Sequence, residues 1–233
     1  MAVKTYLSDN EILAMIGKTE FLRDKVILVF LSDVGCRVSE LLAIKIENID
    51  LEKRVVLIPH LKRGMKKKCP GCGRSAGGKQ KYCTNCAADL RPVVAEGIEE
   101  RSRLVNFGEK TAGYLRPFIK DMDPEEKLID LRRQQVWNIV REAGERIGLK
   151  GRCILNPETG KKHFVHPHNF RDSLAVAWLS FAGGDMGKQK ALQMHLGHRS
   201  FATTQRYQKL TPMAVQNIND EVRNFRFAGE VKE

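Results

Sequence analysis

The chain lacks long apolar segments, a secretion signal and internal repeats. Its longest apolar run, Val26–Leu31, has six residues, whereas a helix that spans a membrane needs about 20. The N-terminus has neither the basic start nor the apolar stretch of a signal peptide. No repeat or low-complexity tract is present. These absences argue against a membrane protein or a solenoid and predict a cytoplasmic protein with no membrane partner.

Acidic residues are scarce relative to basic ones. The chain has 28 Asp and Glu residues and 40 Lys and Arg residues, which gives a net charge of +12 and a pI of about 9.5. Such an excess predicts an anionic partner such as nucleic acid, although a solvated basic surface is the alternative. The apolar content of 42% over 233 residues is typical of one globular domain, alone or with a small module.

Cysteines are few, but four of them form two Cys-x-x-Cys pairs. A two-residue gap lets a tight turn aim both thiolates at one tetrahedral metal. The stretch between the pairs, 73–82, is short and Gly-rich, which indicates a hairpin between two metal knuckles. One structural zinc ion is therefore predicted, with two disulfides or a redox pair as the alternatives. The predicted ligands are Cys69, Cys72, Cys83 and Cys86. The other two cysteines, Cys36 and Cys153, are interpreted as buried small residues.

Apolar periodicity predicts a mainly α protein with a small antiparallel β-sheet, an α+β fold. Helices are expected at 8–16, 21–32, 38–46, 110–120, 132–147, 167–181, 188–195, 200–208 and 213–225. Strands are expected at 54–61 and 103–107, where β-branched residues gather. The cysteine module, 62–102, would be a zinc-ribbon-like insertion between these two strands.

Four residues in the last third of the chain, with Arg37 far upstream, suit chemistry on a phosphate group. The side chains of Arg37 and Arg171 offer rigid N–H forks that fit phosphate oxygens. The imidazoles of His168 and His198 can donate hydrogen bonds or move a proton. The hydroxyl of Tyr207 can attack phosphorus, but with a pKa near 10 only about 0.1% is ionised at neutral pH. It needs electrostatic stabilisation of the transition state, and nothing in this scheme requires a catalytic metal.

The order and spacing of these residues resemble those of the tyrosine recombinases, or phage-type integrases. The first motif is Val34-Gly-Cys-Arg-Val-Ser-Glu, with Arg37 at a predicted helix start. The second is His166-Pro-His-Asn-Phe-Arg, and the third is Leu196-Gly-His, followed nine residues later by Tyr207. The resemblance extends over nearly the whole chain and implies the catalytic-domain fold of that family, with an inserted zinc ribbon.

The resemblance also implies a role for each matching residue. Arg37 and Arg171 would clamp the non-bridging oxygens of the scissile phosphate, and His198 would add a third donor. Tyr207 would be the nucleophile that forms a 3′-phosphotyrosyl bond and frees a 5′-hydroxyl. Glu40 would support Arg37 without touching DNA.

Two further roles are less closely defined by the resemblance. His168 would carry a proton or donate to the phosphate. A lysine in a strand turn would protonate the 5′-oxygen, and Lys62 is the choice because it follows the first strand directly; Lys66, Lys67 and Lys68 compete with it. The expected DNA-binding residues around this turn are Lys62, Arg63, Lys66, Lys67, Lys68 and Arg103.

The family resemblance predicts double-stranded DNA as the partner, and self-association on DNA as a tetrameric synapse. The helix expected at 213–225 would dock on a neighbouring protomer or, alternatively, on its own core. The family's N-terminal core-binding domain is expected to be absent, so that 1–233 forms one catalytic domain. The cysteine module would then add a basic lobe that partly replaces this domain, or be an inert insert.

Three functions are compatible with these residues. The leading interpretation is a site-specific recombinase or integrase. A type IB topoisomerase-like enzyme would use the same chemistry but only relax supercoils, and the exchange of strands between duplexes would separate the two. A DNA-binding regulator with a zinc ribbon is the third, although such a protein would have no need for Tyr207.

Overall fold

The computed structural model describes residues 4–59, 66–94, 102–156, 159–198 and 200–207. The chain divides into two compact units. Unit 1 comprises Met1–Ile58 and Leu104–Glu233, and unit 2 comprises Pro59–Arg103. In the part of the chain that is described, no helix has both the length and the apolar character needed to cross a membrane. The predicted α+β class is confirmed.

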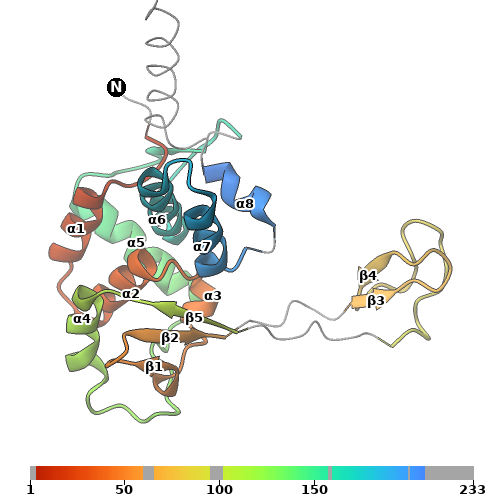
Figure 1. Ribbon diagram of the computed structural model, residues 1–233, viewed down its shortest axis with the longest axis horizontal. Coiled ribbons are helices and arrows are strands. Elements are labelled where there is room, and N and C mark those ends of the chain that lie inside the picture. The colour runs from red at the N-terminus through yellow and green to blue at the C-terminus, as the bar shows by residue number, and fades with distance from the viewer. Residues whose placement is uncertain (1–3, 60–65, 95–101, 157–158, 199, 208–233) are drawn as a thin grey trace, which may run out of the picture. The chain divides into compact units, whose positions relative to one another are not determined.

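Unit 1 consists of a group of helices with a small sheet at one edge (Figure 1). Its helices are α1 (Asp9–Gly17), α2 (Leu22–Asp33), α3 (Val38–Leu41), the 3₁₀ helix η1 (Ile46–Asn48), α4 (Glu109–Ile119), α5 (Arg133–Arg146), α6 (Pro167–Ala182), α7 (Met186–Leu196) and α8 (Phe201–Gln205). The strands β1 (Ile49–Asp50), β2 (Val55–Ile58) and β5 (Arg103–Asn106) form one sheet in the order β1-β2-β5. A separate antiparallel pair is formed by β6 (Ile154–Leu155) and β7 (Lys162–His163).

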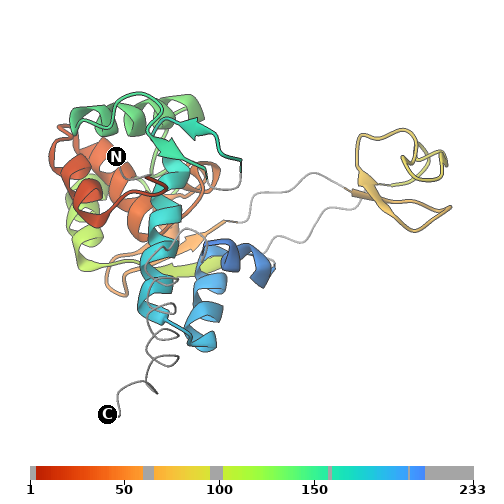
Figure 2. The same ribbon diagram turned by 90° about the horizontal axis from the view of Figure 1, so that it is seen from above.

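Helix α2 is the centre of the hydrophobic core. Every residue of Val26–Leu31 is at most 2% exposed, because a helix that is apolar on all sides must be covered on all sides. The helices α1, α4, α5 and α6 contribute side chains to the same cluster, together with Val56 and Ile58 of β2. The rotated view in Figure 2 shows these helices gathered around α2.

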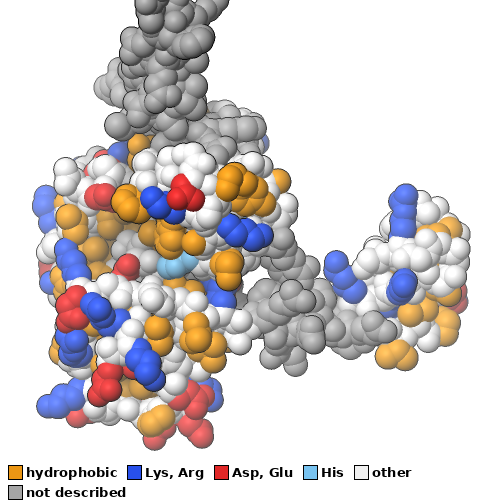
Figure 3. Space-filling view, in the orientation of Figure 1, with side chains coloured by type: hydrophobic (Ala, Val, Ile, Leu, Met, Phe, Trp, Pro, Cys, Tyr) orange, Lys and Arg blue, Asp and Glu red, His pale blue; other side chains and the backbone are white. Residues whose placement is uncertain are grey.

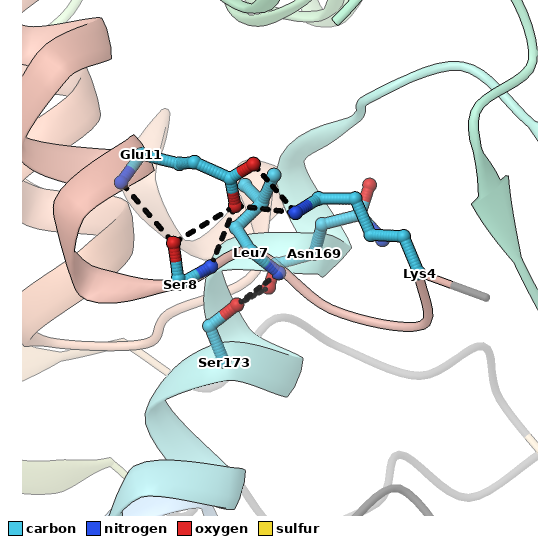
Figure 4. A network of polar contacts seen from close by, with 6 residues as sticks. All are labelled: Lys4, Leu7, Ser8, Glu11, Asn169 and Ser173. Atoms are coloured by element: carbon cyan, nitrogen blue, oxygen red, sulfur yellow. Dashed lines mark hydrogen bonds and ion pairs between the residues drawn. The ribbon is translucent and has the colours of Figure 1, made fainter. Parts of the chain in front are cut away.

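The N-terminal segment is tied to α6 by polar contacts (Figure 4). Ser8 caps α1 in a capping box with Glu11, whose carboxylate also pairs with Lys4. The backbone N–H of Leu7 donates to the Ser173 hydroxyl of α6 at 3.0 Å. This contact joins residues 166 positions apart and holds the first turns of α6 against the start of the chain.

Unit 2 has its own small core. An antiparallel pair of strands, β3 (Lys66–Lys68) and β4 (Ser75–Gly77), carries it. Four buried residues form the core cluster: Cys69, Ala76, Cys83 and Leu90. So few buried apolar groups cannot offset the entropy of ordering such a segment, which points to the cysteines as its main stabilising element.

Two predicted helices are longer than the observed ones. The helix expected at 38–46 ends at Leu41, because the backbone beyond it pairs with a distant segment. Ile44 accepts a hydrogen bond from the N–H of Leu128, and the N–H of Ile46 donates to Glu126. The helix expected at 200–208 is observed as α8 and ends at Gln205. The helix expected at 213–225 lies outside the described residues.

Candidate active site

The first predicted arginine stands at the start of α3, after a tight turn. Gly35 in this turn has φ +63°, a left-handed conformation that favours glycine. A Cβ at Gly35 would meet a Leu174 methyl group at 2.6 Å, so the close approach of α6 also requires glycine there. Arg37 itself is held by Glu40, whose carboxylate accepts from the Arg37 backbone N–H at 2.9 Å and from its Nη1 at 2.8 Å. The Glu40 side chain is 4% exposed.

The second motif forms the beginning of α6. The His166 backbone N–H donates to the Asn169 side chain at 2.9 Å, and Pro167 takes the first helical position, where its missing N–H costs nothing. His168 and Arg171 follow three residues apart and therefore project from the same side of the helix.

Arg171 connects the first and third motifs. Its residue is 3% exposed, and its guanidinium donates to the Gly35 carbonyl through Nη1 and to the Leu196 carbonyl through Nη2. The two carbonyls come from the turn after α2 and from the end of α7. A single buried cation thus joins three segments that are far apart in sequence, and its orientation is fixed before any ligand arrives.

The third motif places His198 beside Tyr207. Gly197 ends α7 in a left-handed conformation, and the His198 Nδ1 then lies 2.9 Å from the Thr204 hydroxyl. The His198 and Tyr207 rings stack, with centroids 5.9 Å apart and planes 17° apart. Tyr207 also packs against a cluster formed by α6 and α7: Ala175, Leu179, Leu192 and Leu196.

Two neighbouring charged groups, Arg171 and Asp172, influence the ionisation of the Tyr207 hydroxyl. Burial raises the pKa of Tyr207, and the nearby Asp172 raises it further, while Arg171 acts in the opposite direction. Burial also raises the pKa of Asp172 to about 6, although Tyr207 and the charges of Arg171 and Arg206 oppose the rise.

His168 lies in the positive field of the arginines. Desolvation by the surrounding protein lowers its pKa, and the charges of Arg171, Arg37 and Arg133 lower it further. The neutral imidazole is therefore favoured at pH 7, a form that can accept a proton as well as donate a hydrogen bond.

His166, the residue before α6, packs against α5. Its ring stacks on Trp137 of α5 at 5.1 Å and lies 4.5 Å from the His163 ring. Burial, with the charges of His163 and His168, lowers the pKa of His166 to about 4. His166 is accordingly a neutral packing group at physiological pH.

The structure therefore brings five of the predicted residues into one region. Arg37, His168, Arg171, His198 and Tyr207 are linked by the contacts and charges given above. Sequence reasoning missed Asp172 and Thr204. The available signals were weak: Asp172 directly follows an arginine of the second motif, and Thr204 precedes Tyr207 by three residues.

The predicted basic residues belong to unit 2, to the start of β5 or to positions that are not described. Lys62 and Arg63 are outside the described residues. Lys66, Lys67 and Lys68 form β3 of unit 2, and the Lys67 ammonium donates to the Leu90 carbonyl at 2.6 Å. Arg103 begins β5.

The four cysteines of unit 2 converge on one point. Their sulfur atoms all lie within 4.8 Å of one another, with Cys69 and Cys86 3.4 Å apart and Cys72 and Cys83 3.6 Å apart. A tetrahedral ion with bonds of about 2.3 Å separates its sulfur ligands by about 3.8 Å, which these sulfurs match. All four are free thiols, not disulfides, and the backbone N–H of Arg74 is the main cause that lowers the pKa of Cys72 to about 6. The cluster could bind a metal.

The remaining cysteines are not ligands of this cluster. Cys36 is buried, as expected, and Cys153 is half-buried. Burial raises the pKa of the Cys153 thiol, which favours an unreactive, protonated group.

Comparison with known protein families gives one extended match. The profile described as "Phage integrase family" matches residues 5–71 and 89–213. The unmatched segment between them contains Cys72, Cys83 and Cys86, so this part of the cysteine module is not a general feature of the family.

Curated relatives include recombinases from bacteria and archaea. Tyrosine recombinase XerD of Bifidobacterium longum (strain NCC 2705) is 31% identical over 191 residues, which cover 82% of this chain and 51% of that protein. Tyrosine recombinase XerA of Pyrococcus horikoshii (strain OT-3) is 29% identical over 206 residues, which cover 88% of this chain and 56% of that protein. The chain thus spans about half the length of the curated relatives it matches.

Solved structures share the fold. The crystal structure of XerA recombinase superposes with a TM-score of 0.61 at 22% identity, covering 96% of this chain and 66% of that one. A crystal structure of XerH site-specific recombinase bound to its difH substrate gives a TM-score of 0.57 at 16% identity, covering 88% of this chain and 50% of that one.

Proposed function

The chain belongs to the phage integrase family, and from this premise we propose that it cuts and rejoins double-stranded DNA as a site-specific recombinase. The observation that supports the proposal is a chain of interactions through the predicted residues. The charges of Arg37 and Arg171 both act on His168. Arg171 also acts on Tyr207, whose ring stacks with that of His198. Such an arrangement suits a phosphodiester group, which needs cations around its oxygens and a nucleophile in line with the bond that breaks.

Arg37 and Arg171 would bind the non-bridging oxygens of the scissile phosphate. Both are held by protein acceptors before DNA binds: Arg37 by Glu40 and Arg171 by two backbone carbonyls. Holding the donors in place in advance avoids reorganisation when charge develops on the phosphate oxygens. His198, oriented by Thr204, would add a third donor, and His168 would serve as a phosphate donor or proton carrier.

Tyr207 would attack the phosphorus and form a 3′-phosphotyrosyl bond. The 5′-oxygen would leave with a proton from a lysine, for which Lys62 stays the candidate. The freed 5′-hydroxyl of a second strand would then attack the phosphotyrosine and release Tyr207. These steps exchange one phosphodiester bond for another and need no external energy source.

The cysteine cluster would hold one structural zinc ion. Four thiolates at tetrahedral spacing are the donor set typical of structural zinc, and a zinc ion would supply the folding energy that the small core of unit 2 lacks. The ion would have no part in catalysis in this scheme.

Unit 2 would also contribute to DNA binding. Its basic residues among 66–94 are Lys66, Lys67, Lys68, Arg74, Lys79, Lys81 and Arg91, and several such side chains are visible on its surface in Figure 3. The single acidic residue in that range, Asp89, is already paired with Arg91 at 2.6 Å. Unbalanced exposed cations suit the DNA backbone and would make binding depend on salt.

Covalent trapping tests the proposed function. Wild type and Tyr207→Phe are incubated with supercoiled plasmid and with nicked duplexes that carry a randomised central segment, and the reaction is stopped with detergent. Protein attached to 3′ ends in wild type alone is the expected result. An equal amount of adduct in Tyr207→Phe would refute the assignment of the nucleophile. Exchange of strands between two duplexes would distinguish a recombinase from a topoisomerase-like enzyme. The size of the protein–DNA complex would test the proposed tetramer.

A further inference from the structure

We propose that Thr204 is a positioning residue: its hydroxyl fixes neutral His198 as the tautomer with the proton on Nε2, which makes this nitrogen a hydrogen-bond donor for the scissile phosphate. The inference rests on the proposed function and deepens it, because each nitrogen of a neutral imidazole either donates or accepts, depending on the tautomer. The Thr204 Oγ1 lies 2.9 Å from the His198 Nδ1. Thr204 is 1% exposed and His198 is 9% exposed, so the bond is shielded from water.

The surroundings of Thr204 set the direction of this hydrogen bond. A buried hydroxyl whose proton has no acceptor costs about 1–3 kcal/mol. The hydroxyls of Thr19 and Ser173 donate to a carbonyl four residues earlier, at 2.8 and 2.7 Å. Among the residues that the structure describes, no carbonyl accepts from the Thr204 hydroxyl, which is bonded to the His198 Nδ1 instead. The hydroxyl therefore donates to Nδ1, and the proton of the neutral imidazole lies on Nε2.

Other contacts hold His198 in the position that this bond requires. The His198 N–H donates to the Gln193 carbonyl at 3.0 Å, and the Gln193 Nε2 donates to the His198 carbonyl at 2.9 Å. The imidazole stacks on the Tyr207 ring, with the two planes 17° apart. Because ring nitrogens bond in the plane of the ring, neither nitrogen is aimed at the face of the Tyr207 ring, and Nε2 is directed away from Thr204.

This arrangement gives the two histidines of the site different tasks. With Nδ1 bonded to Thr204 and a proton on Nε2, neutral His198 has no lone pair left to accept a proton. Desolvation and the nearby arginines lower the pKa of His168, so its neutral imidazole can accept one. The role of proton carrier therefore falls to His168, whereas His198 is a fixed donor.

Nitrogen NMR tests the tautomer without DNA. The full chain is labelled with ¹⁵N and studied at about pH 8, where an ordinary imidazole is neutral, and His198→Gln identifies the His198 signals. Wild type should have a protonated Nε2 and an unprotonated Nδ1. In Thr204→Val the Nδ1 signal should move towards that of a nitrogen without a hydrogen bond, and in Thr204→Ser it should stay near the wild-type position. A protonated Nδ1 in wild type would overturn the proposal.

Single-turnover adduct formation tests the role in cleavage, on the nicked duplex from the pool above that wild type cleaves fastest. Thr204→Val keeps the shape of the side chain but removes the hydroxyl. It should react about 10- to 100-fold more slowly, a part of the effect of losing a whole electrostatic donor. Thr204→Ser should retain most of the rate. Thr203→Val makes the same change at the preceding position of α8 and should cleave as wild type.

A double-mutant cycle shows whether Thr204 acts through His198. In a His198→Ala background, Thr204→Val should cause little further loss of rate, because the group that Thr204 orients is gone. An equal loss in both backgrounds would mean that Thr204 only stabilises α8, and the proposal would be wrong. An unchanged rate in Thr204→Val would refute it as well.

Failure of this proposal differs from failure of the proposed function. If wild type forms no adduct on any duplex or plasmid, the proposed function fails, and the NMR spectrum still decides the tautomer. If wild type forms the adduct but His198 carries its proton on Nδ1, the proposed function stands and the role given to Thr204 is wrong.

Discussion

Replacing Glu40 by glutamine should separate the support of Arg37 from general stability. The carboxylate accepts two hydrogen bonds from Arg37, at 2.9 and 2.8 Å, and its side chain is 4% exposed. A glutamine has only one acceptor oxygen, so one of the two Arg37 donors would face an amide N–H group. A hydrogen bond to a charged group is worth about 1.5–3 kcal/mol. We therefore expect Glu40→Gln to lose about 1.5–3 kcal/mol of unfolding free energy.

Glu11→Gln is a matched control in the same chain. Glu11 also closes a capping box, accepts from the Ser8 N–H at 2.8 Å and pairs with a basic residue, Lys4. Its side chain is 25% exposed, so solvent screens the pair and about 1 kcal/mol is expected. It lies near the start of α6 (Figure 4) but has no contact with Arg37.

Two measurements compare the variants. Urea denaturation gives the free energy of unfolding, and adduct formation at a temperature well below both melting points gives the cleavage rate. Glu40→Gln should be about 10- to 100-fold slower, because each 1.36 kcal/mol of lost transition-state stabilisation is a factor of ten, while Glu11→Gln should cleave as wild type. Equal stability losses in the two variants, or an unchanged rate in Glu40→Gln, would refute the reasoning that Glu40 holds Arg37 in place.

Four further predictions follow from the same contacts. Gly35→Ala should cost about 1–3 kcal/mol, because the residue has φ +63° and its new Cβ would meet Leu174 at 2.6 Å; urea denaturation measures this, and a neutral result would contradict it. Arg171→Lys should lower the cleavage rate about 10²- to 10³-fold. It should also reduce stability, because one ammonium cannot replace the two guanidinium nitrogens that donate to the Gly35 and Leu196 carbonyls. An unchanged melting temperature would argue against a role of Arg171 in joining these segments. Chelation of the proposed zinc ion should abolish a melting transition of unit 2 and leave that of unit 1 in place, as calorimetry can show; loss of both would mean that unit 1 depends on the ion. His166→Phe should weaken a pH dependence: the folded-state pKa of His166 is lowered to about 4 from about 6.5 unfolded, so the wild type should lose more stability than the variant as pH falls from 6.5 towards 4 in urea denaturation.

Much of this fold follows from local patterns in the sequence. The long helices α2, α5 and α6 lie within two residues of their predicted ends. The family resemblance is confirmed by the profile match. Long-range pairing is what local patterns miss: the helix predicted to Ile46 ends at Leu41 because residues 126–128 take its backbone groups. The two-residue strands β6 and β7 carry too few side chains for a detectable alternation.

In the candidate site, too, the sequence indicates the residues but not all of their contacts. The arginines, histidines and tyrosine were recognisable by spacing, and they are brought together by contacts between distant segments. The packing of Tyr207 on the cluster formed by α6 and α7 depends on how the segment after α8 is placed, so no spacing rule in either segment indicates it. The zinc prediction rested on ligand spacing, and the sulfur positions could bind a metal, whereas the identity of the ion is a matter for measurement.

The position of unit 2 in the chain has a consequence for the history of the protein. Strand β2 ends at Ile58, β5 begins at Arg103, and the two are neighbours in one sheet. At the far end of this pair the Phe107 N–H bonds to the Arg54 carbonyl, so the strands run antiparallel, and the ends that flank unit 2 are about 5 Å apart. A segment held between such closely spaced ends can be gained, lost or replaced by a short turn at little cost to the host domain. This hairpin is thus a position at which a module could be added or exchanged without any change in the proposed catalytic residues.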